Sequence, residues 1–154
     1  MGIVNLTPDS FSDGGDHLSV KKAVDTAENM IENGVDIIDI GGESTRPGSI
    51  PISIDEEWLR IGEVLKQLVK FHIPISVDTS KPSIMMKALD TGIDILNDVS
   101  GFQTKESLKV VESANLEKVG FCVMHMQGTP ETMQSCPRYV DVVAEVEHFL
   151  QEKK

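Results

Sequence analysis

Short apolar runs alternate with longer amphipathic segments along the whole chain. The apolar runs are rich in Ile and Val and almost uninterrupted by polar residues, as is typical of strands buried on both faces of a parallel sheet. They cover residues 2–6, 35–42, 73–80, 93–101 and 120–126. Repeated strand–helix units predict a parallel sheet with right-handed crossovers that pack helices against it.

The amphipathic segments predict five helices with recognisable ends. Apolar residues recur at steps of three and four from Val20 to Ile31, and Gly34 follows in the position of a C-terminal cap. Ser53 and Glu56 have the spacing of a capping box at the start of the second helix, which should end before Pro74. The other three helices are expected between Ser80 and Gly92, between Lys105 and Lys118, and over residues 139–154.

Polar side chains lie at or near the carboxyl end of every expected strand. They are Asn5, Asp39, Asp78, Asn97 with Asp98, and His125. In a (β/α)8 barrel these ends converge on the face that carries the active site, whereas an open sheet spreads them along an edge. We therefore expect an α/β fold of the TIM-barrel class. The five strands are fewer than a closed barrel needs, so residues 1–154 should form one domain with an incomplete barrel.

Composition and charge exclude some classes of protein. Of 154 residues, 40% are hydrophobic, and the formal net charge is -11, which disfavours binding to the phosphate backbone of a nucleic acid. No apolar run reaches the length of a membrane helix, and the N-terminus lacks the pattern of a signal peptide. We expect a cytoplasmic protein in which Cys122 and Cys136 are reduced structural thiols. One disulfide between them is the alternative.

The segment GGESTRPGS follows the second expected strand. Its glycines allow close backbone approach, Ser44 and Thr45 offer hydroxyl groups, and Arg46 offers a fork of donors to a carboxylate or phosphate. Pro47 stiffens the chain beside the arginine. The alternative is a surface loop with a solvated arginine.

Three further residues are candidates because of where they stand. Asp78 follows a buried strand and could accept hydrogen bonds from a nitrogen heterocycle; it could instead cap the next helix, but Thr79 and Ser80 can do that. Asn97 could donate to and accept from the same ring, or be a satisfied buried amide. His125 is more typical of a structural residue, since no second histidine stands at a metal-site spacing.

The first connector, NLTPDSFSDGGDH, is longer than the two to six residues that a connector typically needs. Asp9, Asp13 and Asp16 lie near glycines, but the residue order and closing glutamate of an EF-hand are missing, so a calcium loop is not expected. The surplus length indicates a functional loop.

Together, the segments MGIVNLTPDSFSDGG, IDIGGESTRPG, ISVDTSKP, ILNDVSG and VMHMQGTPETMQ closely resemble dihydropteroate synthase. The resemblance runs from Met1 to the last helix. It implies a TIM-barrel transferase of folate biosynthesis that joins p-aminobenzoate to 7,8-dihydropterin-6-ylmethyl diphosphate, in the presence of Mg²⁺, and releases pyrophosphate. In this family, sulfonamides compete for the aminobenzoate site.

The resemblance also implies a catalytic group at the diphosphate. Asn5 would contact Mg²⁺ and the leaving diphosphate. Thr45 and Arg46 would lie beside the diphosphate and the aminobenzoate, and Pro47 would shape that pocket. Asn5 and Arg46 are therefore the expected catalytic residues, and Asn5 the expected metal ligand.

The same resemblance implies a pterin pocket and a lid. Asp78 and Asn97 would hydrogen-bond the pterin, and Met124 would pack against its ring. Phe11 would lie at the tip of a lid that closes over the reacting centre. The hinges of that lid would be Pro8 and Gly14 with Gly15.

Family motifs of the later strands are absent, so the chain resembles roughly the first five-eighths of such a barrel. We expect little or no synthase activity from it alone. The exposed sheet edge predicts oligomers, a homodimer among them. Two alternatives are a pterin-binding domain of a corrinoid-dependent methyltransferase and a non-catalytic half-barrel that binds pterin.

Overall fold

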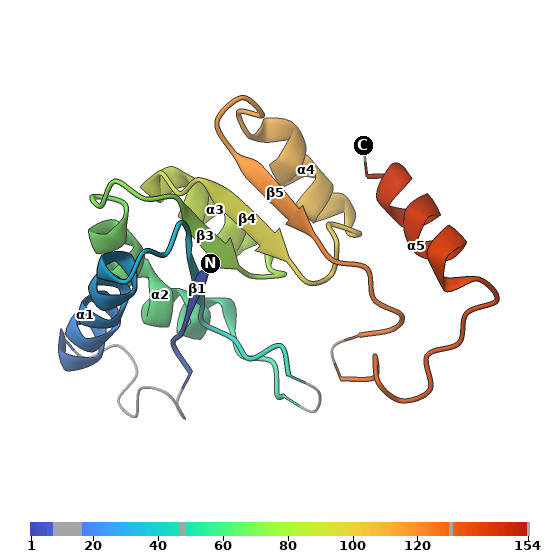
Figure 1. Ribbon diagram of the computed structural model, residues 1–154, viewed down its shortest axis with the longest axis horizontal. Coiled ribbons are helices and arrows are strands. Elements are labelled where there is room, and N and C mark those ends of the chain that lie inside the picture. Colours follow the sequence, from blue (N-terminus) through green and yellow to red (C-terminus); the bar gives the residue numbers. More distant parts are fainter. Residues whose placement is uncertain (8–16, 47–48, 130, 154) are drawn as a thin grey trace.

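The computed structural model describes residues 1–7, 17–46, 49–129 and 131–153, and within them five strands alternate with five helices (Figure 1). The strands are β1 (Gly2–Asn5), β2 (Ile38–Gly41), β3 (Ile75–Asp78), β4 (Ile95–Asp98) and β5 (Gly120–Val123). The helices are α1 (His17–Glu32), α2 (Ile54–Leu68), α3 (Pro82–Thr91), α4 (Lys105–Ser113) and α5 (Val142–Gln151).

The sheet follows the order of the sequence. Its strands run β1-β2-β3-β4-β5, and every neighbouring pair is parallel. α1 to α4 contact one another in that order, as expected when right-handed crossovers between consecutive parallel strands place their helices on one face (Figure 1). A doubly wound sheet would reverse its strand order at a switch point. The arrangement is therefore that of a barrel wall, as the sequence predicts.

One face of the sheet forms the core with the helices. The register aligns Val4, Ile40, Val77 and Leu96 across four strands, and all four side chains are buried. Side chains alternate between the two faces of a strand, so the residues between them point away from the helices. The apolar stripe expected on α1 completes this core. Its buried members are Val20, Ala23 and Ala27.

Several helix ends form as predicted. The Ser53 side chain accepts a 3.1 Å hydrogen bond from the Glu56 backbone N–H, although the Glu56 carboxylate pairs with Arg60. Gly34 and Gly92 have φ of 87° and 91°, a backbone conformation that glycine adopts without steric cost. Left-handed glycines therefore end both α1 and α3, as expected.

The start of α3 and the end of α4 differ from the prediction. The N-cap of α3 is Lys81, whereas Thr79 accepts a hydrogen bond from the Lys81 N–H. The fourth helix ends at Ser113, short of the expected Lys118. Its chain turns because the Asn115 side chain accepts from a backbone N–H two residues later, a local bond that competes with helix geometry.

The last helix lies apart from the sheet, beyond the β5 edge (Figure 1). It begins at Val142, three residues after the expected start, because the Asp141 side chain caps it by accepting from two backbone N–H groups. Phe149 packs edge-to-face on His125, with ring centroids 5.0 Å apart. Contacts between rings therefore tie α5 to the segment that follows β5.

Cys122 and Cys136 are both free, as expected, and both side chains are exposed. In the parts of the chain that the structure describes, no helix has the length and apolar character needed to cross a membrane.

Candidate active site

One row of side chains crosses the sheet at the carboxyl ends of its strands. The register aligns Asn5, Gly41, Asp78, Asn97 and Cys122, one residue from each strand. Because this row alternates with the buried apolar row, it lies on the face that the helices leave open. The sequence-predicted residues Asn5, Asp78 and Asn97 are thus brought together on one face and at one level.

A second row on the same face lies one step deeper. It includes Asp39 and Ser76, which are neighbours in the register and are both buried. The Ser76 hydroxyl donates a 2.5 Å hydrogen bond to Asp39 Oδ1, and Asn97 Nδ2 reaches the same oxygen at 3.5 Å. The Asp39 carboxylate therefore lies beneath the first row, and donors on β3 and β4 hold it in position.

Asp78 has the most perturbed environment in the row. Burial, followed by the charges of Asp39, Asp98, Glu57 and Glu43, raises the pKa of Asp78 to about 7. Its Oδ1 is buried and has no hydrogen-bond partner among the described residues. A buried acceptor without a donor is costly, and such a group is a candidate for contact with a ligand.

Asn5 ends β1 beside a glycine of β2. A Cβ on Gly41 would lie 3.3 Å from Asn5 Oδ1 and 3.7 Å from the Asp78 Cβ, so the two side chains flank the glycine. The Asn5 side chain is exposed. The lack of a side chain at Gly41 therefore lets Asn5 and Asp78 lie close to it on either side, at the carboxyl ends of their strands.

The loop after β2 carries the predicted anion-binding residues. Thr45 is half-buried and Arg46 is exposed. Within the described segments, the Arg46 guanidinium forms no ion pair. The Ser49 N–H donates to the Arg46 carbonyl at 3.1 Å, and the Ser49 hydroxyl donates to the Ser44 carbonyl at 2.6 Å. These two bonds hold the backbone of the loop, while the Arg46 guanidinium faces solvent.

The remaining candidates fall into two groups. Met124, half-buried, directly follows β5, and His125 packs between the rings of Tyr139 and Phe149, which fits the expected structural role. Phe11 and Pro47 lie outside the described residues, as do the proposed hinges at Pro8, Gly14 and Gly15.

Asp98 does not join the site, although the sequence placed it with the other polar strand ends. Its side chain is fully buried on the helix side of the sheet. Its carboxylate accepts from the backbone N–H groups of Ser100 and Phe102, both at 2.8 Å. It therefore shapes the turn after β4.

Sequence reasoning missed two parts of the site. Ser76 stands two residues before Asp78, and strand alternation from Asp78 could have placed it on the same face. The second part is an ion cluster in which Lys81 lies 2.7 Å from Glu43 and 2.5 Å from Glu57. Glu43 and Lys81 lie in segments that the sequence singles out, GGESTRPGS and ISVDTSKP, but nothing in the sequence pairs these two residues with each other or with Glu57.

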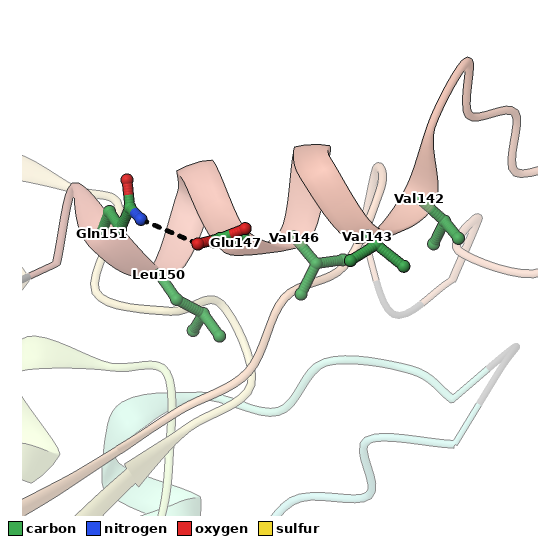
Figure 2. Close-up of a pocket in the computed structure, with 6 residues that line it drawn as sticks. All are labelled: Val142, Val143, Val146, Glu147, Leu150 and Gln151. Atoms are coloured by element: carbon green, nitrogen blue, oxygen red, sulfur yellow. Dashed lines mark hydrogen bonds between the residues drawn. The ribbon is translucent and has the colours of Figure 1, made fainter.

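A separate apolar hollow lies on α5 (Figure 2). Four of its lining side chains, from Val142 to Leu150, are apolar, and the Gln151 amide donates to Glu147 at 3.1 Å. Phe149, which packs on His125, does not line it. The lining is mainly apolar and its two polar residues bond to each other, so the polar rows are the better candidate site.

Comparison with known proteins matches this arrangement. The family model described as "Pterin binding enzyme" matches residues 1–154. The dihydropteroate synthase of Neisseria meningitidis serogroup B is 49% identical over 152 residues, which are 97% of this chain and 53% of that protein. The chain thus spans about half the length of the curated relatives it matches.

Solved structures agree. The Yersinia pestis dihydropteroate synthase, in a complex with a sulfonamide drug, superposes with a TM-score of 0.87 at 39% identity, over 99% of this chain and 55% of that one. The Xanthomonas albilineans dihydropteroate synthase with 4-aminobenzoic acid has a TM-score of 0.84 at 44% identity, over 99% and 53%. From its polar rows, its strand order and these matches, the chain belongs to the family of pterin binding enzymes.

Proposed function

We propose that this chain forms the pterin-holding side of a dihydropteroate synthase site. The observation that carries the proposal is the buried Asp78 oxygen, which has no donor among the described residues and faces the open side of the sheet. The amino-pyrimidinone ring of a pterin offers the N–H donors that Asp78 Oδ1 lacks among the described residues. A ligand of that kind would satisfy Asp78 and offset the cost of burying it.

Asn97 and Met124 would complete the contacts to the ring. Asn97 Nδ2 donates to Asp39 Oδ1 at 3.5 Å through one hydrogen, so the amide oxygen and the other hydrogen stay available for a ligand. Met124 is half-buried directly after β5, and its thioether would pack against the face of a heterocycle. The pterin would thus be held at its edge by Asp78 and Asn97.

The proposed reaction joins p-aminobenzoate to 7,8-dihydropterin-6-ylmethyl diphosphate. The amino nitrogen bonds to the methylene carbon, the carbon–oxygen bond to the diphosphate breaks, and pyrophosphate leaves with that electron pair while the amine loses a proton. Negative charge grows on the departing group, where a fixed cation lowers the barrier. Arg46, which forms no ion pair with the described residues, would contact the diphosphate and the aminobenzoate together with Thr45.

Mg²⁺ is part of the proposal, with Asn5 as its protein ligand. Mg²⁺ usually binds through few protein oxygens while substrate phosphates and water complete its shell. The Asn5 amide oxygen fits this role because it is exposed at the end of β1 beside Gly41. No cluster of three acidic, His or Cys residues in the described segments could hold the ion without such help. The bound ion would add positive charge beside the diphosphate.

Four further expectations belong to the same proposal. Phe11 would cover the reacting centre and Pro47 would shape the aminobenzoate pocket. The chain would act in the cytoplasm, where its free thiols at Cys122 and Cys136 stay reduced. A homodimer is the proposed assembly.

Calorimetry with 6-hydroxymethyl-7,8-dihydropterin tests the proposal on the 154-residue chain. We expect saturable binding that Asp78→Ala and Asn97→Ala each weaken at least about tenfold, since each removes a hydrogen bond to a buried polar partner. Asp90→Ala, an exposed aspartate of α3, is the matched control and should bind normally. Absence of heat, or equal affinity in all variants, contradicts a pterin site.

A second titration separates the synthase from the methyltransferase alternative. A methyl-transfer site has neither a diphosphate nor an aminobenzoate to hold. We therefore expect p-aminobenzoate to bind only when pyrophosphate and Mg²⁺ are present. In Arg46→Ala, pyrophosphate and Mg²⁺ should no longer promote the binding of p-aminobenzoate. A pyrophosphate-release assay tests the expectation that this chain alone has little or no turnover, and normal turnover contradicts it.

A further inference from the structure

One ammonium group connects two of the loops that border the site. Lys81 Nζ lies 2.7 Å from Glu43 Oε2 and 2.5 Å from Glu57 Oε2. Glu43 follows β2 in the loop that carries Arg46, Glu57 lies in the first turns of α2, and Lys81 follows β3. The side chains of Lys81 and Glu43 are 19% and 18% exposed, and that of Glu57 is fully buried. The cluster is therefore largely shielded from water.

Lys81 is a poor residue for its position in α3. It is the N-cap and makes no capping hydrogen bond with its side chain. Helix N-caps favour Ser, Thr, Asp or Asn, and a cation near a helix N-terminus opposes the helix dipole. Helix stability does not account for a lysine at this position. Its contacts with residues outside α3 are therefore the better explanation.

Glu57 is a second residue of the cluster whose position lowers the stability of the fold. It is buried among core residues, and its Oε1 has no hydrogen-bond partner in the described parts of the chain. Burial of an ion pair stabilises a fold poorly compared with apolar packing, and its best-supported use is to specify one geometry. The cluster is thus better explained by what it positions than by what it stabilises.

Its other contacts show what is positioned. The Glu43 carboxylate, besides binding Lys81, accepts a 2.7 Å hydrogen bond from the Ile52 N–H at the far end of the loop. Arg60 donates to the Gly42 carbonyl at 2.8 Å, and a Cβ on Gly42 would lie 3.0 Å from the Glu57 Cγ. Both ends of the loop therefore meet at Glu43, directly against α2.

We propose that Lys81 is a positioning residue that holds Glu43 against Glu57 and thereby fixes the loop that presents Thr45 and Arg46. The assignment of that loop to a diphosphate rests on the proposed function, whereas the clamp itself does not. Burial lowers the pKa of Lys81, but its hydrogen bonds to Glu43 and Glu57 outweigh this and leave the pKa above its ordinary value. The lysine therefore stays charged, as a clamp requires.

Amide hydrogen exchange, resolved by NMR, tests the clamp. The reporter is the Ser49 N–H, which bonds to the Arg46 carbonyl and touches none of the three clamp residues. Glu43→Ala keeps the Lys81–Glu57 pair and should speed Ser49 exchange at least about tenfold, with the strand amides unchanged. Glu43→Gln, whose amide oxygen can still accept both hydrogen bonds, should restore most of the protection.

Glu63→Ala is the matched control, because Glu63 pairs with Lys66 at 3.3 Å on the exposed side of α2. Equal Ser49 exchange in Glu43→Ala and Glu63→Ala would overturn the proposal. The lysine itself is tested with Lys81→Met combined with Glu57→Gln, which leaves no unpaired charge at the fully buried position 57. The Ser49 N–H should exchange as fast in that double variant as in Glu43→Ala. Exchange at the rate of the unmodified chain would show that Lys81 is not the clamp.

Pyrophosphate binding with Mg²⁺ connects the clamp to the site. Charge alone predicts that removal of the Glu43 carboxylate strengthens the binding of an anion, because repulsion falls. Loss of positioning predicts the opposite, and we expect Glu43→Ala to weaken pyrophosphate binding at least about fivefold. Tighter binding would overturn the positioning role. If the unmodified chain binds no pyrophosphate, the proposed function fails while the exchange result still decides the clamp.

Discussion

Ser76 and Asp39 lie opposite each other on β3 and β2, and the Ser76 hydroxyl donates a 2.5 Å hydrogen bond to the Asp39 carboxylate. Both side chains are buried. The only other donor to that oxygen is Asn97, at 3.5 Å, so Ser76 is the principal partner among the described residues. The buried Asp39 carboxylate therefore depends mainly on one donor, the hydroxyl of Ser76, which looks like an ordinary core residue in the sequence.

Ser76→Ala should destabilise the chain, because it removes the donor and leaves a buried carboxylate poorly satisfied. Hydrogen bonds to charged groups contribute about 1.5–3 kcal/mol, and we expect a loss of about 2 kcal/mol in the free energy of unfolding. Urea denaturation measures it. Ser83→Ala, an exposed serine in the first turn of α3, is the control. Equal losses in the two variants would contradict a special role for Ser76.

Asp78 should make stability depend on pH. Its pKa of about 7 in the folded chain lies above the value of an unfolded aspartate, so its protonated form favours folding. This contribution is complete below about pH 4 and is lost as the pH rises toward about 7. Asp78→Asn stays neutral throughout, so it should be more stable than the original chain by on the order of 2 kcal/mol at about pH 8 and similar at about pH 4.

Urea denaturation at the two pH values checks this prediction. Asp90→Asn, which neutralises an exposed aspartate of α3, is the control and should show no such divergence. A constant stability difference between Asp78→Asn and the original chain across the pH range would contradict the burial of an ionisable Asp78. The same Asp78→Asn variant should bind the pterin ligand less tightly, a stability gain that costs function.

Gly42 should tolerate no side chain. A Cβ at this position would lie 2.8 Å from Ile61 Cγ2 and 3.0 Å from Glu57 Cγ, closer than packed carbon atoms approach. Gly42→Ala should therefore cost about 1–3 kcal/mol through overpacking, measured by thermal or urea unfolding. Gly120→Ala is the control, because its nearest atom would lie at an ordinary 3.5 Å. Similar costs at both glycines would contradict the close approach of the loop to α2.

The chain should self-associate in solution. The outer edges of β1 and β5 have no strand partner in the described parts of the chain, and unpaired edges favour pairing with another chain. Two apolar residues of α5, Val143 and Leu150, are 72% and 43% exposed. Light scattering should show species larger than a monomer, and Val143→Glu with Leu150→Glu should reduce them. A clean monomer for the unmodified chain would contradict this prediction.

Local pattern was sufficient to predict most of the fold. Buried strands rich in Ile and Val, glycine stops at Gly34 and Gly92, and the Ser53 cap each act within a few residues, so the sequence carries them directly. Boundaries were less accurate where side chains compete for backbone groups. Asn115 ended α4 early and Asp141 delayed α5, because each bonds to nearby N–H groups in place of a further helical turn.

The site was predictable only along single strands. Asn5, Asp78 and Asn97 were found because each ends an apolar run, and the end of a strand is visible in the sequence. The sequence did not reveal that Asp98 points toward the helices, that Ser76 supports Asp39, or that Lys81 clamps Glu43. Each depends on partners far apart in the sequence or on the face a strand turns to its helices.

The sequence by itself determined the alternation of strands and helices and the polar types at their ends, because propensity and periodicity are local properties of the chain. Only the tertiary structure decided which of these side chains share a face, which carboxylates crowd Asp78, and what holds Glu43 in place. The physical reason is that register and burial bring together residues such as Glu43 and Lys81, 38 positions apart. Electrostatic interactions between buried groups follow those distances in space.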